Sequence, residues 1–162
     1  RMIVGGEDPV FIARRLLILA AEDIGNANPN ALLLANTCMQ SVQNIGYPEC
    51  RIILSQTVIY LAMSPKSNSA YMAIEEALEM AQKTTHLPVP LHLRNAPTKL
   101  MKNIDYGKNY KYAHQFEGSF VDLEFMPESL IGKTFFNPSS DKKEQEMKLQ
   151  LMKWWKGKYN YE

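Results

Sequence analysis

The stretch from residue 24 to residue 65 carries almost no charge. Its 42 residues include only two charged side chains, Glu49 and Arg51. At the 22% charged residues of the whole chain, about nine would be expected there. Because a helix face in contact with water normally carries Lys, Glu and Arg, protein is expected to cover this stretch on most sides.

Proline, glycine and capping residues divide the first half of the chain into four predicted helices. Aspartate or asparagine followed by proline is a typical helix start, and glycine is a typical helix end. The predicted helices begin near Asp8-Pro9, Asn28-Pro29, Pro48 and Ser67 or Asn68, and they end near Gly25, Gly46, Ser64-Pro65 and Lys83. Their short connections favour antiparallel neighbours in a bundle.

The chain changes character near His86. Residues 87–91 contain two prolines and are predicted to be extended, because the residue before a proline avoids the helical region. A short helix is predicted from Pro97, and a charged final helix over residues 141–156. Residues 104–140 have no sustained period but are rich in aromatic side chains, so ordered irregular structure is expected there.

These patterns predict an all-α protein of one domain. Residues 1–85 form a helical bundle, and residues 86–162 form an irregular, basic, Pro- and Tyr-rich extension with a C-terminal helix packed on it. The net charge is +1, and no run of 18 apolar residues exists. We therefore expect no membrane association and a cytoplasmic protein with reduced cysteines. Arg1–Val4 is expected to continue an earlier element, so the chain is expected to be a piece of a longer protein.

The second predicted helix has a polar face of amides and hydroxyls without charges. Such a face suits hydrogen bonding to another protein, and interface cores are depleted in charge. Two apolar residues also lie among charged ones on the first predicted helix. The predicted oligomer interface therefore includes Phe11, Ile18, Asn36, Gln40, Gln43 and Asn44. The alternative is a hairpin covered by other elements of the same chain, which accounts better for the third helix than for the second.

No pattern in the chain predicts catalysis or a bound cofactor. A phosphate-binding loop would need a glycine at position 127, ahead of Gly132-Lys133-Thr134, but Pro127 stands there. The three histidines lack metal-binding spacing, and the two cysteines lie in apolar surroundings that raise thiol pKa. We expect no catalytic, cofactor or metal site in these residues.

One basic segment, residues 94–112, favours a second hypothesis. Its lysines and arginine could neutralise phosphates while its tyrosines stack on unpaired bases. The residues predicted to contact DNA or a neighbouring domain are Arg94, Lys99, Lys102, Lys108, Tyr110 and Lys111. The alternatives are that the tyrosines fasten an irregular loop to the bundle, or that the loop contacts an acidic surface of a neighbouring domain.

Several blocks of sequence resemble one known family. They are Glu7-Asp8-Pro9 with Phe11–Arg15, Ala21–Gly25, Tyr60–Ala62 with Pro65–Asn68, Pro88–Met101, and Tyr106–Lys108 with Phe120-Val121. In this order they resemble the C-terminal region of the MgsA/RarA family of AAA+ ATPases, which includes the Werner-helicase-interacting ATPase. The resemblance spans residues 1–138, with a departure at residues 123–127.

This resemblance implies a clamp-loader-collar-like oligomerisation domain that assembles a homotetramer. It also implies that the whole protein is a DNA-dependent ATPase at stalled replication forks, with single-strand-binding protein as a partner. The ATP and Mg²⁺ sites of such a protein would lie in the ATPase domain that precedes this region. The chain itself is therefore expected to be a scaffold rather than an enzyme.

Overall fold

The computed structural model describes residues 1–161 and is helical throughout its regular elements, with no strand in that part of the chain. This confirms the all-α prediction. The chain divides into two compact units. The helical unit comprises residues 1–76 and 135–148, and the extension unit comprises residues 77–134 and the chain from residue 149 on. The predicted boundary between residues 85 and 86 stays a prediction.

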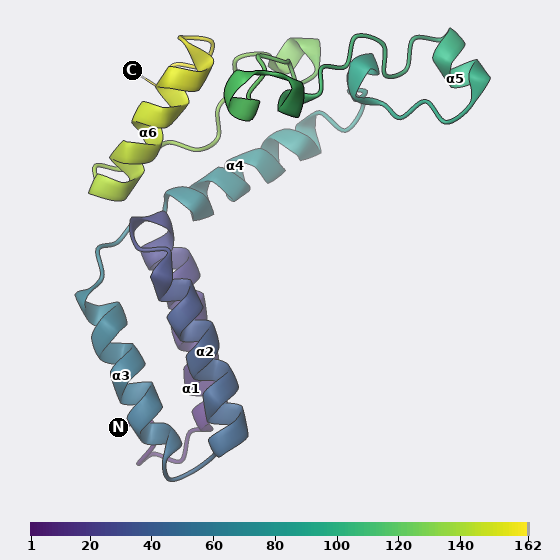
Figure 1. Cartoon of the computed structure of the whole chain (residues 1–162). Coiled ribbons are helices and arrows are strands. Elements are labelled where there is room, and N and C mark those ends of the chain that lie inside the picture. Colours follow the sequence, from purple (N-terminus) through teal and green to yellow (C-terminus); the bar gives the residue numbers. More distant parts are fainter. Residues whose placement is uncertain (162) are drawn as a thin grey trace. The chain divides into compact units, whose positions relative to one another are not determined.

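Three helices form the body of the helical unit: α1 (Pro9–Leu19), α2 (Asn30–Ile45) and α3 (Cys50–Met63), shown in Figure 1. The Asp8 side chain caps α1 by accepting a hydrogen bond from the Val10 N–H at 3.0 Å, as the sequence predicts. Gly46 ends α2 with a positive φ of 72°, a conformation that favours glycine.

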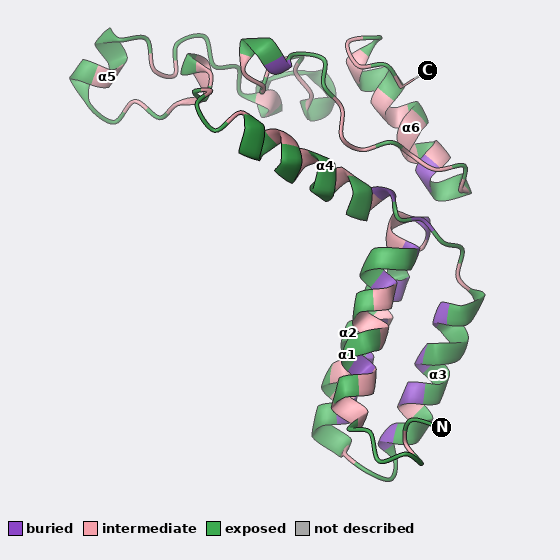
Figure 2. Ribbon diagram, turned by 180° about the vertical axis from the view of Figure 1, so that it is seen from behind, coloured by how far each residue is buried: buried purple, intermediate pink, exposed green. Residues whose placement is uncertain are grey.

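Small side chains dominate the core between these helices. The buried residues form two clusters, Ala13, Cys38, Val42, Cys50 and Leu54 in one, and Ala20, Ile24, Ala31, Ala35 and Leu61 in the other. Most of them lie on α1, α2 and α3, whose buried positions Figure 2 shows, and Ala20 and Ile24 lie in the turn that follows α1. Because alanine and cysteine lie at the contacts, many of the larger apolar residues of α2 and α3 stay outside this core.

The chain after α1 differs from the simple helix that was predicted to run to Ile24. The α-helical pattern ends at Leu19, and a π-helical turn over Ala20–Ile24 leads to Gly25. Gly25 has a φ of +51°, and a Cβ atom there would lie 2.8 Å from the carbonyl oxygen of Ser67. The glycine is therefore required for a close approach of two backbone segments as well as for the turn.

Helix α4 (Ser69–Lys83) and helix α6 (Lys142–Trp155) begin in the helical unit. The first turn of α6 carries Glu144, whose side chain is fully buried. Its carboxylate accepts hydrogen bonds from the Ser69 hydroxyl and from the Ser139 N–H, at 2.5 Å and 2.6 Å.

The extension unit is made of short turns, as the irregular composition predicts. It contains one short α-helix, α5 (Lys99–Asn103), capped by the Thr98 hydroxyl, which accepts from the Met101 N–H at 3.2 Å. The remaining regular pieces are the 3-10 turns Leu91–Leu93, Ala113–Gln115, Glu117–Ser119 and Glu128–Leu130. The second half of α6 completes this unit.

Candidate assembly interface

A charge-free groove lies between α2 and α3. It has a volume of about 640 Å³ and is lined by Asn30, Leu33, Leu34, Thr37, Gln56, Ile59 and Tyr60. Leu33 is 67% exposed and Ile59 is 62% exposed. The groove thus presents apolar side chains to solvent, with amide and hydroxyl groups and no charge among its lining residues.

The outer face of α3 is apolar as well. Ile52 and Met63 are 69% and 82% exposed, and with Ile59 they follow the spacing of one helical face. The buried residues of α3 lie on its other side: Cys50, Leu54, Thr57 and Leu61. Within the helical unit these side chains are exposed, and the alternative in which the same chain covers the third helix stays a prediction.

A polar contact fixes the edge of the groove. The Asn28 amide donates to the Tyr60 hydroxyl at 3.1 Å and to the Ser64 hydroxyl at 3.0 Å. These bonds join Asn28, two residues before the start of α2, to the C-terminal end of α3. Tyr60 is thereby held in place with its side chain 37% exposed beside Ile59.

The six residues predicted for an oligomer interface are all exposed. Asn36, Gln40, Gln43 and Asn44 lie on α2, and Phe11 and Ile18 lie on α1. Leu33 and Thr37 from the groove continue into Gln40 and Asn44 at helical spacing, so that these four residues share one face of α2. Their exposure makes them accessible to a partner, and their role in assembly stays a prediction.

The six residues predicted to contact DNA or a neighbouring domain divide into two groups. The Arg94 side chain is engaged inside the loop, where Nε donates to the Val89 carbonyl at 2.7 Å and Nη1 donates to the Tyr106 hydroxyl at 2.9 Å. Lys108 pairs with Asp105 at 2.9 Å. In contrast, Lys99, Lys102 and Lys111 form no ion pair within residues 1–161, and Tyr110 is 53% exposed. The sequence did not reveal that the Arg94 side chain bonds to Val89 and Tyr106 within the loop.

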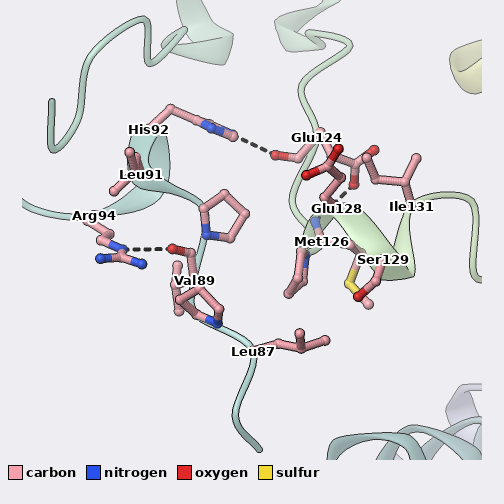
Figure 3. A pocket seen from close by; sticks show the side chains of 13 residues that line it. Leu87, Val89, Leu91, His92, Arg94, Glu124, Met126, Glu128, Ser129 and Ile131 are labelled. Carbon is pink, nitrogen blue, oxygen red and sulfur yellow. Dashed lines mark hydrogen bonds between the residues drawn. The ribbon is translucent and has the colours of Figure 1, made fainter. Parts of the chain in front are cut away.

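A second hollow in the extension unit was not predicted from the sequence. It has a volume of about 700 Å³ and is shown in Figure 3, with Leu87 and Val89 on one side and Met126 and Ile131 on the other. The His92 ring bridges the two sides through a 2.7 Å hydrogen bond between Nε2 and the Glu124 carbonyl oxygen. The one sequence signal for this hollow is the pair of prolines that keeps residues 87–91, part of its lining, extended.

Two further contacts within the units also escaped sequence reasoning. Burial would raise the pKa of Glu144, but hydrogen bonds from Ser69, Ser139 and Ser67 outweigh it and lower that pKa. Burial also opposes the ionisation of Glu124, but hydrogen bonds from the Met126 N–H and from Lys158 hold its pKa below the usual value. Glu144 occurs in a charged stretch whose sequence resembles a solvated surface.

Residues 1–161 hold no group of three or more His, Cys, Asp or Glu side chains placed to bind a metal ion. Cys38 and Cys50 are free and buried in the same core cluster, as expected for reduced thiols. No helix among these residues has the length and hydropathy needed to span a bilayer.

Comparisons with known proteins give a consistent result. The profile of the family described as MgsA AAA+ ATPase C terminal matches residues 1–155. Replication-associated recombination protein A of Coxiella burnetii is 43% identical over 152 residues, which cover 93% of this chain and 34% of that protein. An uncharacterized protein of Thermotoga maritima is 43% identical over 162 residues, covering 100% of this chain and 26% of that protein. ATPase WRNIP1 of Dictyostelium discoideum is 42% identical over 137 residues, which cover 84% of this chain and 16% of that protein. The chain thus spans about a third or less of these relatives.

Proposed function

This chain belongs to the MgsA AAA+ ATPase C-terminal family, and we propose that it assembles the parent ATPase into a homotetramer and serves as its scaffold. The parent protein would be a DNA-dependent ATPase that acts in replication-fork maintenance and recombination. Relatives named replication-associated recombination protein A and ATPase WRNIP1 support this role.

ATP and Mg²⁺ are assigned to the ATPase part of the parent protein and not to these residues. In this proposal the chain has four kinds of partner. It contacts its own copies and the parent ATPase domain directly, and it reaches DNA and single-strand-binding protein through the whole assembly. No membrane partner is proposed.

The observation that carries the scaffold proposal is the exposed, charge-free surface of α2 and α3. Burying an apolar side chain as exposed as Leu33 or Ile59 contributes about 1–2 kcal/mol to association. Several such contacts are needed, because a specific interface buries on the order of 1,000 Å² or more. The groove and the outer stripe of α3 together supply apolar side chains over most of the length of that helix.

Light scattering over a wide range of protein concentration tests this proposal. The chain should have the mass of a tetramer, and Ile59→Glu should lower that mass because it places a charge in the groove. Gln82→Glu is the matched control, since it adds the same charge at an exposed position of α4. A monomer at high concentration, or an unchanged tetramer in Ile59→Glu, would contradict the proposed interface.

The second candidate function is contact with nucleic acid through residues 94–112. The free lysines Lys99, Lys102 and Lys111 and the exposed ring of Tyr110 favour it. Lys99→Glu combined with Lys108→Glu should then weaken DNA binding, which titration at two salt concentrations can measure. Unchanged affinity would eliminate this use of the loop.

A further inference from the structure

Four aromatic side chains form a continuous cluster in the extension unit. The Phe120 ring lies parallel to the Trp154 ring, with centroids 5.7 Å apart and planes at 9°. It meets Trp155 edge-on at 5.0 Å and 84°, and Trp155 meets Tyr159 edge-on at 4.9 Å and 81°. Because each ring is held by another at a defined angle, the face of the cluster is fixed before any ligand arrives.

Lys158 contacts both the aromatic cluster and two neighbouring carboxylates. Its ammonium group lies 2.9 Å from Asp122 Oδ1 and 3.3 Å from Glu124 Oε2. The same group lies 4.9 Å from the centre of the Trp155 ring, within the range of a cation–π contact. Burial acts to lower the pKa of Lys158, but the two carboxylates raise it above the usual value, so the lysine stays charged and pairs with both of them, balancing one of their two negative charges.

The outer side of the cluster opens into a hollow of about 500 Å³ lined in part by Trp154, Lys153 and Lys156. Trp154 is 43% exposed, and the two lysines flank it in sequence near the C-terminal end of α6. Neither lysine forms an ion pair within residues 1–161. Two acids, Glu117 and Asp122, also line the hollow, and Asp122 shares Lys158 with Glu124.

We propose that this hollow is a binding site for single-stranded nucleic acid. An unpaired base stacks on Trp154 beside Phe120, and the neighbouring phosphates pair with Lys153 and Lys156. A flat aromatic face beside free cations matches a base linked to phosphates, whereas bases in a duplex are already stacked on each other.

The charge of the surrounding unit agrees with an anionic ligand. Residues 77–134 and 149–162 hold ten Lys and Arg residues against seven Asp and Glu residues. A basic peptide would be repelled by this unit, and an acidic peptide would not need the exposed ring. The site lies outside residues 94–112 and does not depend on the proposed tetramer, so either can fail without the other.

Tryptophan fluorescence of the full chain gives a direct test, because Trp154 and Trp155 are its only two tryptophans. Oligo(dT) should quench the emission saturably, and the logarithm of the affinity should fall with the logarithm of the salt concentration with a slope of about −1.4 for two phosphate contacts. Trp154→Ala should weaken binding roughly tenfold or more, measured by anisotropy of a labelled strand, while Trp154→Phe should keep most of the affinity.

Two pairs of lysine variants separate this site from the basic loop. Lys153→Gln with Lys156→Gln changes exposed side chains, so that the fold is kept, and should bring the salt slope close to zero. Lys99→Gln with Lys102→Gln is the matched control on α5 and should leave affinity and slope unchanged. A loss of binding in the control pair alone would place the nucleic acid on the loop and overturn the proposal.

Three other results would also overturn it. One is full affinity in Trp154→Ala, and another is the absence of quenching by oligo(dT) at low salt. The third is equal quenching by thymidine monophosphate at the same nucleotide concentration, which would indicate a site for free nucleotides instead of a strand.

Discussion

The Ser69 hydroxyl donates a 2.5 Å hydrogen bond to Oε1 of Glu144, a residue 75 positions further along the chain. The other carboxylate oxygen, Oε2, accepts from the Ser139 N–H at 2.6 Å. Because Glu144 is fully buried, water cannot replace these donors. The pair therefore fastens residues 135–148 to the start of α4 within the helical unit.

Glu144→Gln should destabilise the helical unit by about 1–3 kcal/mol, because an amide retains the shape but loses the charge that the donors stabilise. Urea unfolding followed by circular dichroism measures this change. Glu146→Gln is the matched control, since Glu146 is exposed and pairs only with Lys143 at 3.3 Å. The control should cost about 0.5 kcal/mol or less. Equal losses in the two variants would contradict the role of Glu144.

The same contact predicts a dependence of stability on acid pH. The folded pKa of Glu144 is lowered, so its contribution is present above the unfolded pKa and is lost as the pH falls through the folded pKa. The free energy of unfolding should therefore decrease toward acid pH, and Glu144→Gln should show a smaller decrease. Parallel curves for the two proteins would show that other carboxylates cause the effect.

The two cysteines should react slowly with thiol reagents in the native protein. Cys38 and Cys50 are 1% and 0% exposed, and burial raises the pKa of Cys38, with a smaller rise from Cys50 and an opposing hydrogen bond from Thr57. The reactive thiolate of Cys38 is therefore scarce, and both thiols are inaccessible. Labelling in buffer and in urea, followed by mass spectrometry, compares the rates. Similar rates under both conditions would contradict this burial.

Gly25→Ala should destabilise the helical unit by roughly 3 kcal/mol, because it combines a positive φ with a Cβ contact 2.8 Å from the Ser67 carbonyl oxygen. Gly46→Ala separates the two causes. Gly46 also has a positive φ of 72°, but no atom lies within 4 Å of the position that a Cβ would take there. The Gly46 variant should lose only about 1 kcal/mol, and thermal unfolding of both variants measures the difference. An equal loss of stability in the two variants would show that the backbone moves away from the new Cβ at residue 25 without a free-energy cost.

Gln40→Glu combined with Asn44→Lys should disturb the proposed tetramer. Both residues are exposed and share the α2 face that begins with Leu33 and Thr37 in the groove. New charges there would lose their hydration on assembly. Sedimentation velocity should reveal smaller species. An intact tetramer would move the interface away from this end of α2 without affecting the test at Ile59.

Local signals account for the part of the fold that could be predicted. Asp8, Gly46 and the prolines act on their own backbone neighbours, so the positions of α1 to α4 follow from the sequence to within a few residues. The π-helical turn before Gly25 could not be predicted in this way. The π-helical turn changes the hydrogen-bond register, but the helical segment still ends at Gly25, so the stop signal in the sequence is the same for both kinds of helix.

The candidate sites depend on contacts between distant residues, and they were predicted less completely. The lack of charged residues between positions 24 and 65 indicates that other protein surfaces cover these helices. Composition does not say whether those surfaces belong to the same chain or to a partner. Glu144 lies in a charged run that is typical of a solvated helix, and only Ser69 reveals its burial. Similarly, nothing near Trp154 in the sequence indicates that Phe120 stacks on it.

The absence of charge along the groove between α2 and α3 also determines how an assembly built on it would respond to temperature. Contacts between apolar side chains weaken on cooling, because their driving force near room temperature comes from the entropy of water. A tetramer held by this surface should therefore loosen in the cold. Preparations kept on ice would then contain more free subunits than the same protein kept at room temperature.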